Sequence, residues 1–87
     1  VGFELYQNLP NPWTDRTRVG FHLPESADAI LTVFDETGRT LAVHRGQFSR
    51  GYNSIILENN LLEHSGLLYY KLETGTNSAI RKMVKVR

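Results

Sequence analysis

Apolar and polar residues alternate in short runs along this chain, and a turn signal interrupts the alternation roughly every 8–12 residues. A period of two residues is typical of a half-buried β-strand, and no segment keeps a helical period over about 11 residues. The runs number about seven. We therefore predict an all-β fold, an antiparallel immunoglobulin-like β-sandwich of about seven strands.

Three runs give the clearest strand predictions. They are residues 19–23 with one apolar face, residues 29–34 with apolar side chains on both faces, and residues 66–72 with Leu68, Tyr70 and Leu72 on one face. A strand that is apolar on both faces suits the middle of a sheet. A turn at residues 35–38 follows the second run and places Gly38 where positive φ is needed, so we expect a hairpin over residues 30–44.

The other runs are less regular. We expect a short strand at residues 3–6, a polar loop at 15–17, another loop at 46–51, a strand at 53–57, a turn at 74–77 and a last strand at about 79–86. In the last strand, Ile80, Val84 and Val86 are expected on the inner face. Residues 58–65 are the least regular segment, where Leu61 and Leu62 could fill the core from a single turn of helix.

Two prolines constrain the segment between the first two strands. Pro10 and Pro12 fix φ and lack an amide donor, so residues 7–13 are excluded from helices and from the middle of a sheet. We expect an extended, rigid connector there, with Trp13 packed inward as an anchor. We call residues 7–13 the connector.

Length and composition limit what the chain can be. Its 87 residues make a single domain, residues 1–87, and the absence of cysteine excludes disulfides and thiolate metal sites. The net charge of +1 does not favour nucleic-acid binding, and no apolar run approaches the roughly 20 residues of a membrane helix. Because the chain opens on strand-like sequence without an initiating methionine, we expect a piece excised from a longer secreted protein.

Charge is unevenly distributed, because four basic residues lie in the last seven positions and no acidic residue follows Glu73. These basic residues are Arg81, Lys82, Lys85 and Arg87. Two interpretations are open at this point. The cluster is either the solvated face of a terminal strand or a basic tag that a partner recognises.

Residue patterns that support catalysis or cofactor binding are missing from the sequence. The histidines His22, His44 and His64 have no ligand spacing, no serine lies in a nucleophile elbow, and no glycine-rich phosphate loop occurs. Asp35 and Glu36 lie on a turn that lacks the repeated oxygen ligands of a calcium loop. We therefore predict no enzyme activity, no cofactor and no metal.

Aromatic residues allow two interpretations. Trp13, Tyr6, Tyr52, Tyr69 and Tyr70 either stack on sugars as a platform or pack over the sheet with their hydroxyls hydrogen-bonded. The packing interpretation is the simpler one, because tyrosine is common on strands.

Four motifs together resemble type IX secretion C-terminal sorting domains of type A, the Por secretion system sorting domain. They are Leu-Tyr-Gln-Asn-Leu-Pro-Asn-Pro-Trp at residues 5–13, Val-Phe-Asp-Glu-Thr-Gly-Arg at 33–39, Ser-Gly-Leu-Leu-Tyr-Tyr-Lys-Leu at 65–72 and Arg-Lys-Met-Val at 81–84. Their order and spacing agree with the family over essentially the whole chain. Leu9, Leu57 and Leu68 replace aromatic residues that are common in the family.

The resemblance implies an address signal without catalysis. Such domains lie at the C-terminus of a cargo protein that has reached the periplasm. The outer-membrane machinery of Bacteroidetes-type bacteria recognises the folded domain, and a surface sortase-like protease typically removes it. The implied partners are this machinery, the protease and the parent cargo, with no nucleic acid and no membrane insertion. The implied location is the periplasm and then the outer-membrane surface or the extracellular space.

By resemblance, the sorting motifs nearest the C-terminus assign partner recognition to Gly66, Leu68, Tyr70, Arg81, Lys82, Met83, Val84, Lys85 and Arg87. Structural motif positions are Asn8, Pro10, Asn11, Pro12, Trp13, Asp35 and Gly38. We expect the last strand to present an exposed basic edge that a partner docks through backbone pairing and charge. The alternatives are a carbohydrate-binding or adhesion module and a structural immunoglobulin-like domain of a surface protein.

Overall fold

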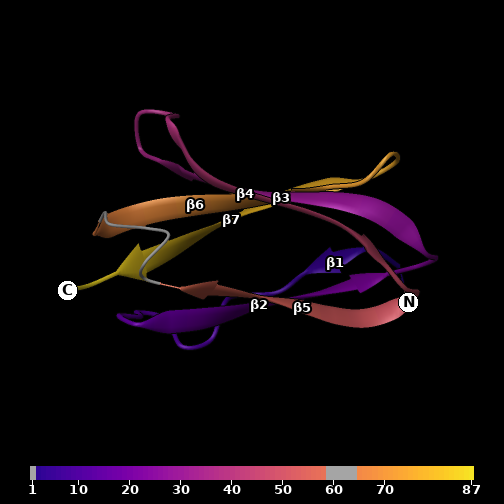
Figure 1. Cartoon of the computed structure of the whole chain (residues 1–87), viewed down its shortest axis with the longest axis horizontal. Coiled ribbons are helices and arrows are strands. Elements are labelled where there is room, and N and C mark those ends of the chain that lie inside the picture. The colour runs from indigo at the N-terminus through magenta and orange to yellow at the C-terminus, as the bar shows by residue number, and fades with distance from the viewer. Residues whose placement is uncertain (1, 59–64) are drawn as a thin grey trace.

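A computed structural model describes residues 2–58 and 65–87, which form two antiparallel sheets packed face to face (Figure 1). One sheet has the order β1-β2-β5, with β1 at Glu4–Leu5, β2 at Arg16–Leu23 and β5 at Gly51–Glu58. The other has the order β4-β3-β6-β7, with β3 at Ala27–Asp35, β4 at Thr40–Phe48, β6 at Gly66–Glu73 and β7 at Ser78–Lys85. The predicted seven-stranded, immunoglobulin-like β-sandwich is confirmed.

The core lies between the two sheets and takes alternate residues mainly from β2, β3 and β6, while β4 contributes partly buried side chains only. The buried apolar side chains of the core are Leu5, Trp13, Val19, Phe21, Leu23, Ala29, Leu31, Val33, Leu57, Leu68, Tyr70, Leu72 and Met83. The predicted inner faces of β2 and β6 are thereby confirmed. So is the central position of β3, which pairs with β4 on one side and β6 on the other. Within the described ranges no segment is helical, and none is a helix long and apolar enough to cross a membrane.

The predicted turn between β3 and β4 is confirmed, with Gly38 at φ 90°. Asp35 holds this turn through one carboxylate oxygen. Its Oδ1 accepts hydrogen bonds from the Thr37 hydroxyl at 2.6 Å, from the Thr37 amide at 2.9 Å and from the Arg39 amide at 3.1 Å. The Thr37 hydroxyl is the main reason that the pKa of Asp35 lies below 3.8, with the two amides and the Arg39 charge adding to it. Asp35 therefore has a structural role in the hairpin.

We expect the substitution Thr37→Val to raise the pKa of Asp35 towards 3.8, because the strongest donor to its charged form is lost. A carboxylate with a depressed pKa stabilises the fold above its unfolded pKa, and that stabilisation disappears as the pH falls through the folded value. A carboxyl NMR titration measures the change. Thr76→Val, in the turn after β6, is the control and should leave the titration of Asp35 where it is; an equal shift in both variants would contradict the assignment.

Two predicted loops are wrong in their bounds. The loop expected at residues 46–51 is mostly strand, since β4 continues to Phe48 and only two residues separate it from β5. Phe48 is carried inward, and its ring meets the edge of Phe21 at 5.1 Å between centroids. The loop expected at residues 15–17 is also wrong, because Arg16 and Thr17 belong to β2 and Thr17 is buried.

The predicted inner face of the last strand is wrong. Ile80, Val84 and Val86 are exposed, whereas Met83 and Lys85 are buried. The cause is the register of the β6–β7 hairpin, in which Met83 lies opposite the buried Leu68. Residues directly opposite one another in an antiparallel pair share a face, so the odd-numbered side chains of β7 point inward.

The two ends of the chain lie at opposite ends of the sandwich (Figure 1). Near the start, Glu4 pairs with His22 at the end of β2. Near the other end, Lys85 pairs with Trp13, just before β2 begins. The N-terminal strand therefore lies beside the end of β2, whereas the end of β7 lies beside the residues that precede β2. The expected core contribution of Leu61 and Leu62 lies outside the described residues.

Candidate functional site

The structure brings the four sequence motifs side by side. Residues 11–13 of the connector lie along β7, β7 pairs with β6, and β6 pairs with β3, which carries Asp35. Segments more than 60 residues apart in sequence thus become neighbours; the hydrogen bond from Asn8 to Tyr70, for example, spans 62 residues. The motifs therefore form one continuous strip, and the connector–β7–β6–β3 strip is the candidate site.

The connector pairs with the outer edge of β7 in parallel. The Trp13 amide donates to the Val84 carbonyl at 3.1 Å, and the Val86 amide donates to the Trp13 carbonyl at 2.8 Å. The Val84 amide donates to Oδ1 of Asn11 at 2.9 Å. The anchoring role of Trp13 is confirmed by this pairing and by the burial of its side chain, which is 1% exposed. The expected extended path of the connector is wrong at residues 10–12, where the chain bends.

Two side chains extend the same contact toward the start of β7. Nε2 of Gln7 donates to the Lys82 carbonyl at 2.7 Å, and Nε of Arg81 donates to the Leu5 carbonyl at 2.7 Å. The Lys82 carbonyl, the Val84 amide and carbonyl, and the Val86 amide therefore already have hydrogen-bond partners. The expectation that β7 offers an open edge for backbone pairing is wrong for residues 82–86, where the connector occupies the edge.

A buried polar network links Asn8 and Pro10 of the connector to Thr17 of β2. Asn8 is fully buried; its Nδ2 donates to the Pro10 carbonyl at 3.1 Å and to Oγ1 of Thr17 at 3.0 Å. The Thr17 hydroxyl donates to the same carbonyl at 2.8 Å. The Asn8 amide donates to the Tyr70 hydroxyl, which donates in turn to the Tyr6 carbonyl. Buried polar groups need such partners, so these residues fix the path of the chain.

Several residues predicted to recognise a partner lie in the core. They are Leu68, Tyr70, Met83 and Lys85. Lys85 is 3% exposed, and its ammonium lies 5.5 Å from the centroid of the Trp13 ring, a cation–π distance. These four side chains support the sandwich and are not displayed on its surface.

The remaining predicted recognition residues are exposed. They are Gly66, Arg81, Lys82, Val84 and Arg87. Lys82 lies at the end of a cross-strand row on the outer face, opposite Tyr69, which lies opposite Phe34. The Phe34 and Tyr69 rings stack at 5.5 Å with 14° between their planes. Sequence reasoning missed this row, although the alternation already placed Phe34 and Tyr69 on the outward sides of their strands.

Within residues 2–58 and 65–87, no cluster of three or more metal-ligating side chains occurs. His22 Nδ1 lies 2.9 Å from the Gly2 carbonyl, and His44 lies on the edge strand β4. His64 falls outside the described residues.

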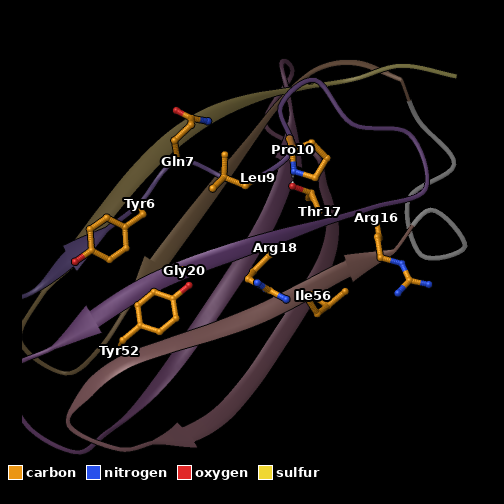
Figure 2. Close-up of a pocket in the computed structure, with 10 residues that line it drawn as sticks. All are labelled: Tyr6, Gln7, Leu9, Pro10, Arg16, Thr17, Arg18, Gly20, Tyr52 and Ile56. Atoms are coloured by element: carbon orange, nitrogen blue, oxygen red, sulfur yellow. Dashed lines mark hydrogen bonds between the residues drawn. The ribbon is translucent and has the colours of Figure 1, made fainter.

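The aromatic residues do not form one platform. Trp13 and Tyr70 are buried, and Tyr69 lies on the outer face of the four-stranded sheet. Tyr6 and Tyr52 lie on the outer face of the other sheet, with ring centroids 6.2 Å apart, where they border a groove (Figure 2). The packing interpretation is confirmed in full for Tyr70, whose hydroxyl is hydrogen-bonded, while Tyr52 and Tyr69 pack over the outer faces of their sheets.

Comparisons of this chain with protein-family models, with curated proteins and with solved structures found no match. The geometry brings together one surface strip, on β7, β6 and β3, and one groove on the opposite sheet.

Proposed function

We propose that this domain is a C-terminal sorting domain that directs a cargo protein across the outer membrane through the type IX secretion system, without catalysis. The observation that carries the proposal is the strip: the four motifs that resemble the family occupy adjacent strands. Motifs that serve one recognition surface are expected to be neighbours in space, although chain folding alone does not require it.

Side chains, and not the β7 backbone, supply the recognition surface in this proposal. The connector occupies the backbone edge, while Lys82 stands beside the Phe34–Tyr69 stack and Val84 is partly exposed on the same face. An exposed aromatic pair is a common feature of protein contacts, because aromatic side chains bury large areas at low entropy cost. The charge of Lys82 beside the pair favours a partner of complementary charge.

The test is export of a reporter. A signal peptide, a reporter and this domain are fused in that order and expressed in a host with a type IX system, and surface and periplasmic reporter are measured. We expect surface delivery with the unmodified domain. Lys82→Glu is expected to lower delivery at least about fivefold, because it reverses the charge next to the aromatic stack without touching the core.

Arg45→Glu is the matched control, since Arg45 is an exposed basic residue at the far edge of the same sheet, on β4. Surface delivery by this variant should stay within about twofold of that by the unmodified domain. Circular dichroism melts establish that both variants fold. A fusion that stays in the periplasm would refute the function, and equal export of both variants would refute the role of Lys82.

A further inference from the structure

The outer face of the β1-β2-β5 sheet carries an open groove of about 670 Å³, which borders the connector (Figure 2). Its apolar lining comes from Leu9 and Pro10 on one side and from Tyr52 and Ile56 of β5 on the other. Leu9 is 72% exposed and Tyr52 is 62% exposed. Large apolar side chains gathered at one exposed hollow point to a ligand or partner.

Gly20 shapes the floor of the groove. A Cβ atom at this position would lie 2.5 Å from the Tyr52 hydroxyl oxygen and 2.8 Å from its Cε1. The Tyr52 ring therefore lies directly on the backbone of β2, a close approach that only glycine permits. Tyr6 stands beside it with 33° between the ring planes, so the two rings form an aromatic wall.

Positive charge lies at one end of the groove. Arg16 and Arg18 project from β2, and Figure 2 shows Arg18 directed between Tyr52 and Ile56. Arg16 is 3.9 Å from Glu58, but both side chains are well exposed, so this pair is weak. For Arg18, the described part of the chain offers no acidic group within ion-pair distance. An anionic group would therefore be favoured at Arg18.

The lining disfavours a neutral sugar. A sugar needs many hydrogen bonds, yet two polar groups beside the groove are already engaged. The Thr17 hydroxyl is bonded to Pro10 and Asn8, and the Gln7 amide to Lys82 and Asn8. What is left for a ligand is apolar surface, the rings and hydroxyls of Tyr6 and Tyr52, and the guanidinium groups.

The size of the face disfavours self-association. Three strands of up to eight residues present roughly 400 Å² at the usual strand spacing and rise. A stable protein interface needs roughly 800 Å² from each partner. A small molecule, by contrast, is well matched to a hollow of this volume.

We propose that this groove binds a small organic anion with a flat apolar body, whose ring lies against Tyr6 and Tyr52 and whose acidic group pairs with Arg18. The planar guanidinium donates two parallel hydrogen bonds to a carboxylate, sulfonate or phosphate group. The aromatic wall and Ile56 cover the apolar body. The groove shares Leu9 and Pro10 with the connector, but the three residues proposed to contact the ring and the acidic group of the ligand, Tyr6, Tyr52 and Arg18, lie outside the connector–β7–β6–β3 strip.

The test uses the whole chain and anilinonaphthalene sulfonate as the probe, followed by NMR of backbone amides. We expect saturable binding with one site per chain, and shifts confined to residues 6–10, 16–20 and 52–56. The neutral analogue phenylnaphthylamine has the same apolar body without the acid and should bind at least about fivefold more weakly. Arg18→Gln is expected to weaken the sulfonate about fivefold or more and to remove the difference between the two probes.

Arg45→Gln, on the opposite sheet, is the control and should leave both affinities unchanged. Tyr52→Ala is a second test variant, and it should lower the affinity of both probes at least about fivefold. The proposal is overturned if the shifts spread over both sheets, if the probes bind equally well, if Arg18→Gln has no effect, or if no saturation occurs at millimolar probe. Tighter binding of cellobiose at the same amides would overturn it in favour of a sugar site.

Discussion

Trp13→Ala is expected to lower the free energy of unfolding by about 3–5 kcal/mol, the usual cost of replacing a buried tryptophan by alanine. Trp13 is the largest fully buried side chain of the domain, and it packs against residues of both sheets in one core cluster. Its backbone also holds the edge of β7 through two hydrogen bonds. An 87-residue domain typically has about 4–13 kcal/mol of stability in total, so a large part of it depends on this one side chain.

Urea unfolding followed by circular dichroism measures this loss. Leu9→Ala is the matched control, because Leu9 lies in the same connector but is largely exposed, and its cost should stay within about 0.5 kcal/mol. The loss of unfolding free energy for Trp13→Phe is expected to lie between those for Trp13→Ala and Leu9→Ala. Trp13→Phe shrinks the ring but also removes the buried Nε1, for which the described residues supply no hydrogen-bond partner. A cost below about 1 kcal/mol for Trp13→Ala would show that the connector does not anchor the sandwich.

The role of the connector illustrates which features the sequence predicts well. Pro10 and Pro12 act on the backbone locally, so the absence of helix and of a central strand at residues 7–13 was predictable, and the inward position of Trp13 was predicted correctly, whereas the bends at residues 10–12 were not. The pairing of Trp13 with Lys85 joins positions 72 residues apart, and no local pattern specifies such a partner. The sequence therefore could not predict that the edge of β7 is occupied, nor that a partner would have to contact side chains instead of the β7 backbone.

The sequence contained enough information to predict the inner face of β7, and the wrong prediction has a physical cause. Counting apolar residues favours Ile80, Val84 and Val86, because β-branched side chains are typical of buried strands. The predicted turn at residues 74–77, however, already implies that Glu73 lies opposite Ser78, as observed. Extending that register places Met83 opposite Leu68, on the buried face. Hairpin geometry was thus the stronger signal than side-chain hydrophobicity.

The candidate site divides in the same way. Exposure of Lys82 and Arg87 follows from charge, because an unpaired ammonium or guanidinium is costly to bury. Lys85 breaks this expectation since its inward position is set by the register of β7 and its ammonium lies over the Trp13 ring. Side-chain type alone could not distinguish these lysines. The groove was likewise hidden, because Leu9, Arg18 and Tyr52 come from three separate segments.

Tyr70→Phe is expected to lower the free energy of unfolding by about 2–4 kcal/mol, although it removes a single oxygen atom. The Tyr70 hydroxyl donates to the Tyr6 carbonyl at 2.7 Å and accepts from the Asn8 amide at 2.9 Å. Each of these backbone groups would lose its partner, at about 1–3 kcal/mol for a group left buried. Two bonds that join β6 to the connector and the segment before it would be lost together.

A second effect distinguishes this account from a simple packing defect. Burial raises the pKa of Tyr70, against smaller opposing effects of the Asn8 amide and the Arg81 charge. The neutral phenol is thus favoured in the folded state, so its stabilisation is complete below the unfolded pKa of about 10 and is lost as the pH rises through the higher folded pKa. The difference in stability between the unmodified domain and Tyr70→Phe should accordingly shrink above about pH 10.

Tyr69→Phe is the control for both effects. Tyr69 is the next residue of β6, but its ring stacks on Phe34 on the outer face, and its loss of a hydroxyl should cost less than about 0.5 kcal/mol at any pH. Urea unfolding at pH 7 and at several values above 9 compares the three proteins. Equal costs for the two substitutions, or a Tyr70→Phe difference that stays constant to alkaline pH, would contradict the hydrogen-bonded role of Tyr70. Because that hydroxyl joins β6 to the connector, its loss should also weaken protection of the Asn8 amide from hydrogen exchange, which Tyr69→Phe should leave intact.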